Sequence, residues 1–390
     1  MPSISLTAHQ AVTSWFEENF RSRGELGASV SIWQHGVEVL SLSHGWCDRQ
    51  CTRPWDAETL APVFSATKAP AALCCLMALE EANLPLDCPV AEVWPEFVGG
   101  GKSTMNFAHL LSHTAGLCAL DERVPIFNYE EVIAALEKQV PLWEPGTRQG
   151  YHARTFGFLM DEVVRRITGV DSLGEYFRET LGSPLGLDFW IGLPSAQWER
   201  VSPMYPGKLS IANSDQPFLK AFNTSGSLTQ RTFTSPLGVN AVSEYNQSSF
   251  WSHGYASMGG VGSARGLGKF YAMLAQGGTW NGVRYVSESI LRQFSHTLSQ
   301  EDDSVLITPI AFAAGVMQDP LDPDPRTDGG KMRQHYGPSL TAYGHPGAGG
   351  CLAFADPENG ISLAYVMNQM EVGALPGPKV LGMVERLYGM

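Results

Sequence analysis

Apolar residues recur at helical intervals in several parts of the chain. Val12, Trp15, Phe16 and Phe20 are three or four residues apart, which predicts an amphipathic helix over residues 7–22. The same reading predicts further helices over 65–84, 106–112, 129–139, 153–168, 172–181, 263–276 and 378–388.

Strand patterns are expected near the two ends of the chain. Residues 28–34 and 37–43 are rich in β-branched and apolar residues and flank His35 and Gly36, which predicts an antiparallel hairpin. Residues 341–370 read as strand, turn and strand, with the turn at residues 357–360. We therefore expect an α+β fold in which both ends build one antiparallel sheet, flanked by the terminal helices, with a helical lobe inserted between them.

This arrangement predicts a single domain over residues 1–390 made of two lobes. Residues 1–63 and 255–390 would form the α/β lobe, and residues 64–254 the mainly helical lobe. A functional site is expected in the cleft between them. Residues 183–254 look irregular, and a segment of that length usually forms a lid or a pocket wall. Its aromatic residues, including those at its edge, either line an apolar cleft or pack the segment onto the body: Trp190, Phe222, Phe233, Tyr245, Phe250, Trp251 and Tyr255.

Composition excludes several classes of partner. The 390 residues include 26 Lys and Arg against 39 Asp and Glu, a net charge of −13, so nucleic acid is not an expected partner. No apolar run has the roughly 18 residues that a membrane span needs. The first residues lack the basic start and apolar core of a secretory signal. Seven cysteines without paired CxxC spacing predict no metal site, and a Cys47–Cys51 disulfide is the less favoured alternative. We expect a reduced cytoplasmic protein.

The first candidate for chemistry is Ser65-Ala66-Thr67-Lys68, at the start of an apolar helix. Serine and lysine three residues apart project from one helix face, so the amine can activate the hydroxyl if burial lowers its pKa. The alternative is a helix-capping serine followed by a surface lysine. Lys68 lies among Ala, Pro, Leu and Cys residues, an unusual place for a solvated charge.

Two further segments suggest the same site. Tyr151 follows a Pro-Gly turn and precedes a predicted helix, so its phenol can point into a cleft, and a nearby ammonium would favour the phenolate. A core tyrosine is the alternative. Residues 343–350, with His345, Gly347 and Ala348, bring closely spaced glycines to the head of a strand, where substrate can approach the backbone. The alternative there is a tight turn that carries a surface histidine.

These elements in this order, with His109-Leu-Leu-Ser-His-Thr-Ala-Gly-Leu117 between the first two, resemble the serine β-lactamase and penicillin-binding-protein superfamily. The match runs from about residue 27 to 370. Residues 150–169, 263–278 and 343–370 are most similar to the family VIII carboxylesterases, the β-lactamase-like esterases and lipases. The resemblance implies the β-lactamase/transpeptidase-like version of the expected fold.

The resemblance also implies roles for single residues. Ser65 would be the nucleophile that forms an acyl-enzyme, and Lys68 and Tyr151 would share the general-base and proton-shuttle work, with the first base unassigned. The N–H of Ala348, beyond Gly347, would stabilise the oxyanion together with that of Ser65. His345 stands where lactamases and transpeptidases carry the lysine of a KTG motif. Trp251 and Tyr255 are candidates for substrate contacts.

Two departures from the superfamily pattern favour ester cleavage. Its YxN motif reads Tyr151-His152-Ala153, so the amide that holds a substrate carbonyl is missing. His345 replaces a fixed cation with a mostly neutral imidazole, which suits an uncharged ester better than a penicillin carboxylate. We expect a serine carboxylesterase that acts on short-chain or aryl esters and needs no cofactor. The alternatives are a β-lactamase, D-amino-acid peptidase, amidase or acyltransferase at the same site, and, least favoured, a binding module without activity.

Overall fold

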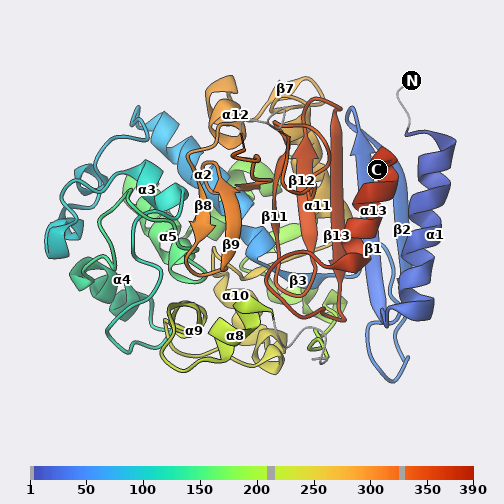
Figure 1. Cartoon of the computed structure of the whole chain (residues 1–390), viewed down its shortest axis with the longest axis horizontal. Coiled ribbons are helices and arrows are strands. Elements are labelled where there is room, and N and C mark those ends of the chain that lie inside the picture. Colours follow the sequence, from blue (N-terminus) through green and yellow to red (C-terminus); the bar gives the residue numbers. More distant parts are fainter. Residues whose placement is uncertain (1–3, 209–215, 325–329) are drawn as a thin grey trace.

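A large antiparallel sheet forms one side of the molecule and a group of helices the other (Figure 1). The computed structural model describes residues 4–208, 216–324 and 330–390. The eight strands of the sheet lie in the order β2-β1-β13-β12-β11-β10-β9-β8. Their bounds are β1 Gly27–Gln34, β2 Val37–Gly45, β8 Ser299–Asp303, β9 Thr308–Phe312, β10 Met317–Gln318, β11 Tyr343–Pro346, β12 Leu352–Asp356 and β13 Ile361–Met367.

The two ends of the chain meet in this sheet, one strand in from its β2 edge. Strand β1 pairs with β13 in a continuous antiparallel register from Ala28↔Met367 to Gln34↔Ile361. Residues of β13 are buried throughout, because helices cover both faces of the sheet. On one face Ser362 donates a hydrogen bond to the carbonyl of Gly268 in α11 (Ala264–Ala275).

The terminal helices cover the opposite face of the sheet. Tyr365, three residues along β13 from Ser362, points to the side of α1 (Leu6–Ser22) and α13 (Pro378–Tyr388). These two helices are packed closely, since Trp15 and Asn19 both donate hydrogen bonds to the carbonyl of Lys379. The predicted α+β fold with a sheet flanked by terminal helices is confirmed.

The helical region also follows the predicted pattern, with boundaries that shift by a few residues. The predicted helices are found as α2 Lys68–Glu81, α3 Phe107–Leu111, α4 Tyr129–Lys138, α5 Thr155–Thr168 and α6 Leu173–Phe177. The helix expected to open at Ser65 instead begins with a tight 3₁₀ turn, η1 (Ser65–Thr67). The helix expected over 172–181 changes after α6 to a wider π turn over Arg178–Gly182.

Strands outside the two ends were not expected. A small sheet pairs β3 (Ala61–Phe64) with β5 (Gly260–Gly262) and β5 with β4 (Phe189–Ile191). Two- to five-residue strands carry too little alternation to be recognised, and β8 has the polar sequence SQEDD. The short hairpin β6–β7 (Thr279–Trp280, Val283–Arg284) and α12 (Glu288–Ser295) complete this half.

The segment 183–254 is more ordered than its irregular sequence suggested. Among its described residues it forms β4, two 3₁₀ helices (Ser195–Arg200 and Val242–Asn246) and three short α-helices, α8 Pro217–Asn223, α9 Leu228–Thr234 and α10 Ser248–His253. Each α-helix has only six or seven residues, so its apolar stripe is too brief to produce a visible period. Across the described part of the chain, no helix has both the length and the apolar character required to cross a bilayer.

Candidate active site

Ser65 lies at a strained junction between β3 and α2. The residue before it, Phe64, has φ 49° and ψ −131°, a conformation that side chains rarely adopt. Its ring packs against Tyr245 at a centroid distance of 4.9 Å, and Thr67 holds the turn by donating to the Phe64 carbonyl and accepting the N–H of Gly260 at 2.9 Å. The turn leaves Ser65 partly exposed while Ala66 and Thr67 are buried. A reactive hydroxyl requires this presentation.

Lys68 is fully buried beside Ser65. Its Nζ lies 3.3 Å from the Ser65 Oγ and 2.9 Å from each of the carbonyl oxygens of Ala153 and Ser257. None of the ion pairs in residues 4–208, 216–324 and 330–390 includes Lys68, and burial lowers its pKa well below the usual value. A neutral amine has two N–H groups for the two carbonyls, and its lone pair is then free to accept the Ser65 proton. The alternative of a surface lysine is therefore wrong.

Tyr151 completes the group and is also buried. Its ring centroid lies 4.8 Å from the Lys68 Nζ, and its hydroxyl is hydrogen-bonded with Ser65. Burial raises the pKa of Tyr151, against a smaller lowering by the Ser65 hydrogen bond. We expected a nearby ammonium to stabilise the phenolate. The structure differs, because the loss of solvent raises the pKa of Tyr151 more than the neighbouring groups lower it. The resting Tyr151 is a phenol.

A buried carboxylate that sequence reasoning missed holds the backbone of Tyr151. Asp303, at the end of β8, accepts the N–H groups of Tyr151 at 3.1 Å, Val305 at 2.9 Å and Leu306 at 2.8 Å. Burial raises the pKa of Asp303, and these backbone hydrogen bonds lower it. Asp303 lies in a polar strand far along the chain from Tyr151, so nothing in the sequence connects the two.

Residues 109–117, which belong to the superfamily resemblance, contact Tyr151 from the helical region. His113 has φ 61°, and its Nδ1 accepts the N–H of His152 at 3.0 Å. Its ring centroid lies 5.0 Å from that of Tyr151 and 4.4 Å from that of Phe312. Tyr151 is thus fixed by side chains from the helical region and from the sheet.

His345 lies on β11, fully buried, with its ring centroid 6.0 Å from that of Tyr151. Burial, with a smaller effect of Lys68, lowers its pKa to about 3, so the imidazole is neutral at ordinary pH. Its Nδ1 lies 2.8 Å from the carbonyl oxygen of Pro346 and must carry the proton to bond there. The Nε2 atom is then an acceptor, and it is buried without a hydrogen-bond partner among the residues that the structure describes. The alternative of a surface histidine is wrong.

The turn after β11 approaches the junction at Ser65 closely. A Cβ on Gly347 would lie 2.2 Å from the carbonyl oxygen of Val63, so only glycine fits there. The N–H groups of Gly347, Gly349 and Gly350 each donate to a backbone carbonyl. Within the described chain, the N–H of Ala348 has no such acceptor. This N–H is therefore available to a ligand, and its role in binding an oxyanion stays a prediction.

The predicted aromatic residues divide into separate groups. Phe233 lies 6.4 Å from Tyr151 between ring centroids and continues through Phe222 to the surface, joined by Phe218, which was not predicted. Tyr245 contacts both Phe64 and Phe250. These two groups flank the catalytic candidates.

Trp190, Trp251 and Tyr255 lie elsewhere. Trp190 and Trp251 pack in a separate small cluster with Leu60 and Val201. Tyr255 stacks on His253 at 5.0 Å, and its hydroxyl is buried without a partner. Ser65, Lys68, Tyr151, His345 and the Ala348 turn are thus brought together, whereas substrate contact by Trp251 and Tyr255 stays a prediction.

Comparison with known proteins places this site in a family context. One relative, the Esterase/beta-lactamase LipL of Mycobacterium tuberculosis, is 29% identical over 364 residues, 91% of this chain and 80% of the relative. A solved family VIII carboxylesterase is 31% identical, with a TM-score of 0.85 over 100% of this chain and 99% of the other. A penicillin-binding protein homologue from Caulobacter crescentus is 32% identical, with a TM-score of 0.83 over 100% and 99% of the two chains.

A D-amino-acid amidase from Ochrobactrum anthropi has the same fold at 19% identity, with a TM-score of 0.68 over 97% of both chains. The family model described as beta-lactamase matches residues 12–377, nearly the whole chain. With this match, and with its sheet, helical region and Ser-Lys-Tyr group, the chain belongs to the beta-lactamase family and is a hydrolase of the serine β-lactamase superfamily.

Proposed function

We propose that this hydrolase is a serine carboxylesterase that cleaves uncharged short-chain or aryl esters through an acyl-enzyme on Ser65. The observation that carries the proposal is the neutral His345. Its buried Nε2 can only accept a hydrogen bond, so a substrate carboxylate, which is also only an acceptor, would be repelled there. An ester carries no charge and is not repelled in this way, and the alcohol that leaves from it and the water that hydrolyses the acyl-enzyme are both hydrogen-bond donors. The esterase names of several relatives support the same choice.

Acylation begins with the proton of Ser65. The neutral Lys68 accepts it as Oγ attacks the ester carbonyl, because the pKa of Lys68 is lowered whereas that of Tyr151 is raised. The negative charge that develops on the carbonyl oxygen is stabilised by the N–H groups of Ala348 and Ser65. The C–O bond then breaks, and Lys68 returns the proton to the leaving alcohol through the Tyr151 hydroxyl.

Deacylation repeats these steps with water in place of the alcohol. Lys68 takes a proton from the water, the hydroxide adds to the acyl carbonyl, and the Ser65 Oγ leaves with the proton restored. The aromatic groups around Phe233 and Tyr245 give apolar surface beside Ser65 for an acyl or aryl substituent.

The direct test is mass spectrometry of the intact protein after brief mixing with p-nitrophenyl butyrate, beside a Ser65→Ala variant. We expect turnover by the wild type, an acyl adduct wherever deacylation is the slower step, and a loss of at least about 10³-fold in the variant. Equal turnover by folded Ser65→Ala would contradict the proposal.

Lactam cleavage is the second candidate, because the name of the Mycobacterium relative includes beta-lactamase. The acylation groups would serve either substrate. We expect kcat/KM for p-nitrophenyl butyrate to exceed that for a chromogenic cephalosporin by at least about 10²-fold, since the cephalosporin carboxylate meets no cation at His345. A ratio in the opposite direction would favour the lactamase.

A further inference from the structure

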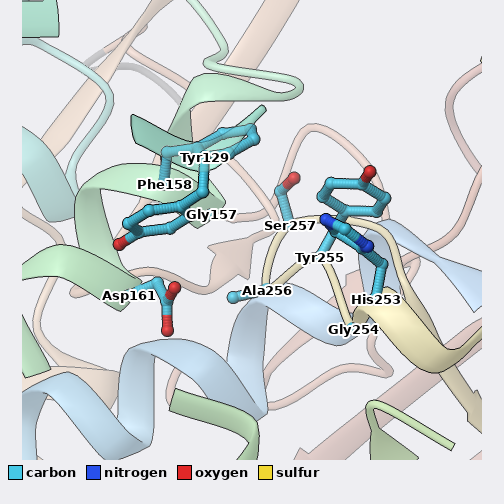
Figure 2. Close-up of a pocket in the computed structure, with 9 residues that line it drawn as sticks. All are labelled: Tyr129, Gly157, Phe158, Asp161, His253, Gly254, Tyr255, Ala256 and Ser257. Atoms are coloured by element: carbon cyan, nitrogen blue, oxygen red, sulfur yellow. The ribbon is translucent and has the colours of Figure 1, made fainter. Parts of the chain in front are cut away.

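A cavity of about 40 Å³ lies behind the catalytic group, between α4, α5 and the segment 253–257 (Figure 2). This volume admits a few water molecules or the head group of a small organic molecule. Its lining consists of Tyr129, Gly157, Phe158, Asp161, His253, Gly254, Tyr255, Ala256 and Ser257.

The cavity is separate from the proposed acylation site. Ser65, Lys68 and Tyr151 do not line it. Ser257 forms the wall between the cavity and the acylation site. Its backbone carbonyl accepts a hydrogen bond from the Lys68 Nζ at 2.9 Å, and the residue itself lines the cavity. The Ser257 hydroxyl donates to the carbonyl of Arg154 at 3.0 Å, which fixes the wall to the segment after Tyr151.

Asp161 gives the cavity a carboxylate, which the charge of Arg165 attracts. Its Oδ1 accepts the N–H of Leu173, but no ion pair in the described residues includes it. The neighbouring Arg165 and Arg166 pair with Glu162 instead, at 3.7 Å and 2.6 Å. The Tyr129 hydroxyl also donates to Glu162.

Burial raises the pKa of Asp161 to about 6, while the Leu173 N–H, Arg165 and a hydrogen bond with Tyr129 lower it. The group is therefore ionised above neutral pH, so this half-buried side chain gives the cavity a negative charge that attracts a cation.

Aromatic rings form the remaining walls. Tyr129 and Phe158 lie 5.8 Å apart between centroids, Phe158 and Tyr255 6.1 Å, and His253 stacks on Tyr255 at 5.0 Å. Figure 2 shows Tyr129 and Asp161 on one side of the cavity and the His253–Tyr255 stack on the other. Burial lowers the pKa of His253, so this ring adds no positive charge at neutral pH. Rings around a single carboxylate are the surroundings that favour an organic cation.

We propose that this cavity is a second binding site that takes a small organic cation, a primary alkylammonium, with its charge on Asp161 and its carbon atoms against the aromatic rings. The site differs from the ester site in charge and in position. An occupant touches Ser257, the residue that also holds Lys68, so the two sites share one wall.

Isothermal titration of the whole protein with methylammonium and ethylammonium chloride at pH 8 and constant ionic strength tests the proposal. Ethanol and acetate serve as neutral and anionic ligands of similar size. We expect saturable binding of the two ammonium ions alone. Asp161→Asn keeps the size and the acceptor for Leu173 and should weaken binding at least about tenfold. Asp171→Asn, an equal change at an exposed position outside the cavity, should leave the affinity unchanged.

Binding that is equal in Asp161→Asn and wild type, or ethanol that binds as well as ethylammonium, would overturn the proposal. If Asp161→Asn does not fold, the pH dependence of ammonium binding by the wild type tests the proposal. Between pH 8 and pH 5 the Asp161 carboxyl gains a proton, so ammonium affinity should fall at least about fivefold, and an affinity that does not change over this range overturns the cation site. These readouts do not depend on ester hydrolysis.

Discussion

Two lysines, Lys68 and Lys379, are almost equally buried and have opposite surroundings. Lys379, on α13, is 3% exposed and lies 3.1 Å from the carboxylate of Glu25, which also accepts the hydroxyl of Tyr365. Lys68 is 0% exposed, and its hydrogen-bond partners among the described residues are two carbonyl oxygens and a serine hydroxyl. The same residue type is a partner in an ion pair in one region and a candidate base in the other.

Buried carboxylates divide in the same way. Asp319 lies 3.2 Å from Lys331, whereas Asp303, beside Tyr151, accepts backbone N–H groups and forms no ion pair within the described part of the chain. Removing one partner of a buried ion pair destabilises the folded protein, because the remaining charge is left without compensation. Unpaired buried charges reduce stability but have shifted pKa values, which general acid–base chemistry requires. We therefore expect the ion pair at Lys379 to act in stability and, on the proposed function, Lys68 to act in the reaction.

The largest expected effect separates the two lysines by activity. Lys68→Met fills the same space without an amine, and we expect kcat/KM for p-nitrophenyl butyrate to fall by about 10³–10⁴-fold. Its melting temperature should equal or exceed that of the wild type, because a costly buried amine is removed. Ester assays and thermal melts measure both. Retention of more than a tenth of the activity would show that Lys68 is not the base.

The opposite result is expected for Lys379→Met. The variant leaves Glu25 buried without its cation and should lose about 3–5 kcal/mol of unfolding free energy, with kcat per folded molecule within about threefold of wild type. Urea titration measures the loss. Adding Glu25→Gln should recover part of it, and a double variant less stable than Lys379→Met would break the comparison.

A smaller effect is expected from Asp303→Asn. The amide oxygen still accepts N–H groups, but its weaker hold on the Tyr151 backbone should lower kcat by about tenfold and leave KM within about twofold. Asp302→Asn, an exposed neighbour, is the matched control and should retain full activity. A loss in KM alone would place Asp303 among substrate contacts instead of positioning residues.

The smallest effects are expected in pH profiles. The pKa of Lys68 is lowered on folding, so between that value and about 10.5 the unfolded chain binds more protons than the folded one. Unfolding free energy should therefore rise with pH through this window in wild type relative to Lys68→Met, measured by urea titration across the window. A flat difference would mean that Lys68 stays protonated in the folded protein.

The activity profile separates Lys68 from His345. Ester hydrolysis should fall on the acid side as Lys68 gains its proton. His345→Asn should change kcat/KM by a few-fold. It should leave the decrease of activity at acid pH in place, because the pKa of His345, about 3, lies below the pH range in which Lys68 gains its proton. A decrease that moves in His345→Asn would be assigned to the histidine.

Local patterns along the chain were enough for much of this fold. The helices over 7–22 and 378–388 and the first hairpin came from the spacing of apolar residues, since each element is long enough to repeat its pattern. The small sheet that carries Ser65 did not, because its strands have three or four residues and one consists of Gly260-Val261-Gly262.

The sequence by itself determined the residues that can react, because Ser65 and Lys68 are one helical turn apart and the tyrosine and glycine segments carry recognisable motifs. Only the tertiary structure decided their chemical state. Burial removes water from Lys68, Tyr151 and His345, and the carbonyls of Ala153 and Ser257 and the carboxylate of Asp303 come from distant segments. A pKa depends on solvent and on neighbours in space, which the order of residues alone does not specify.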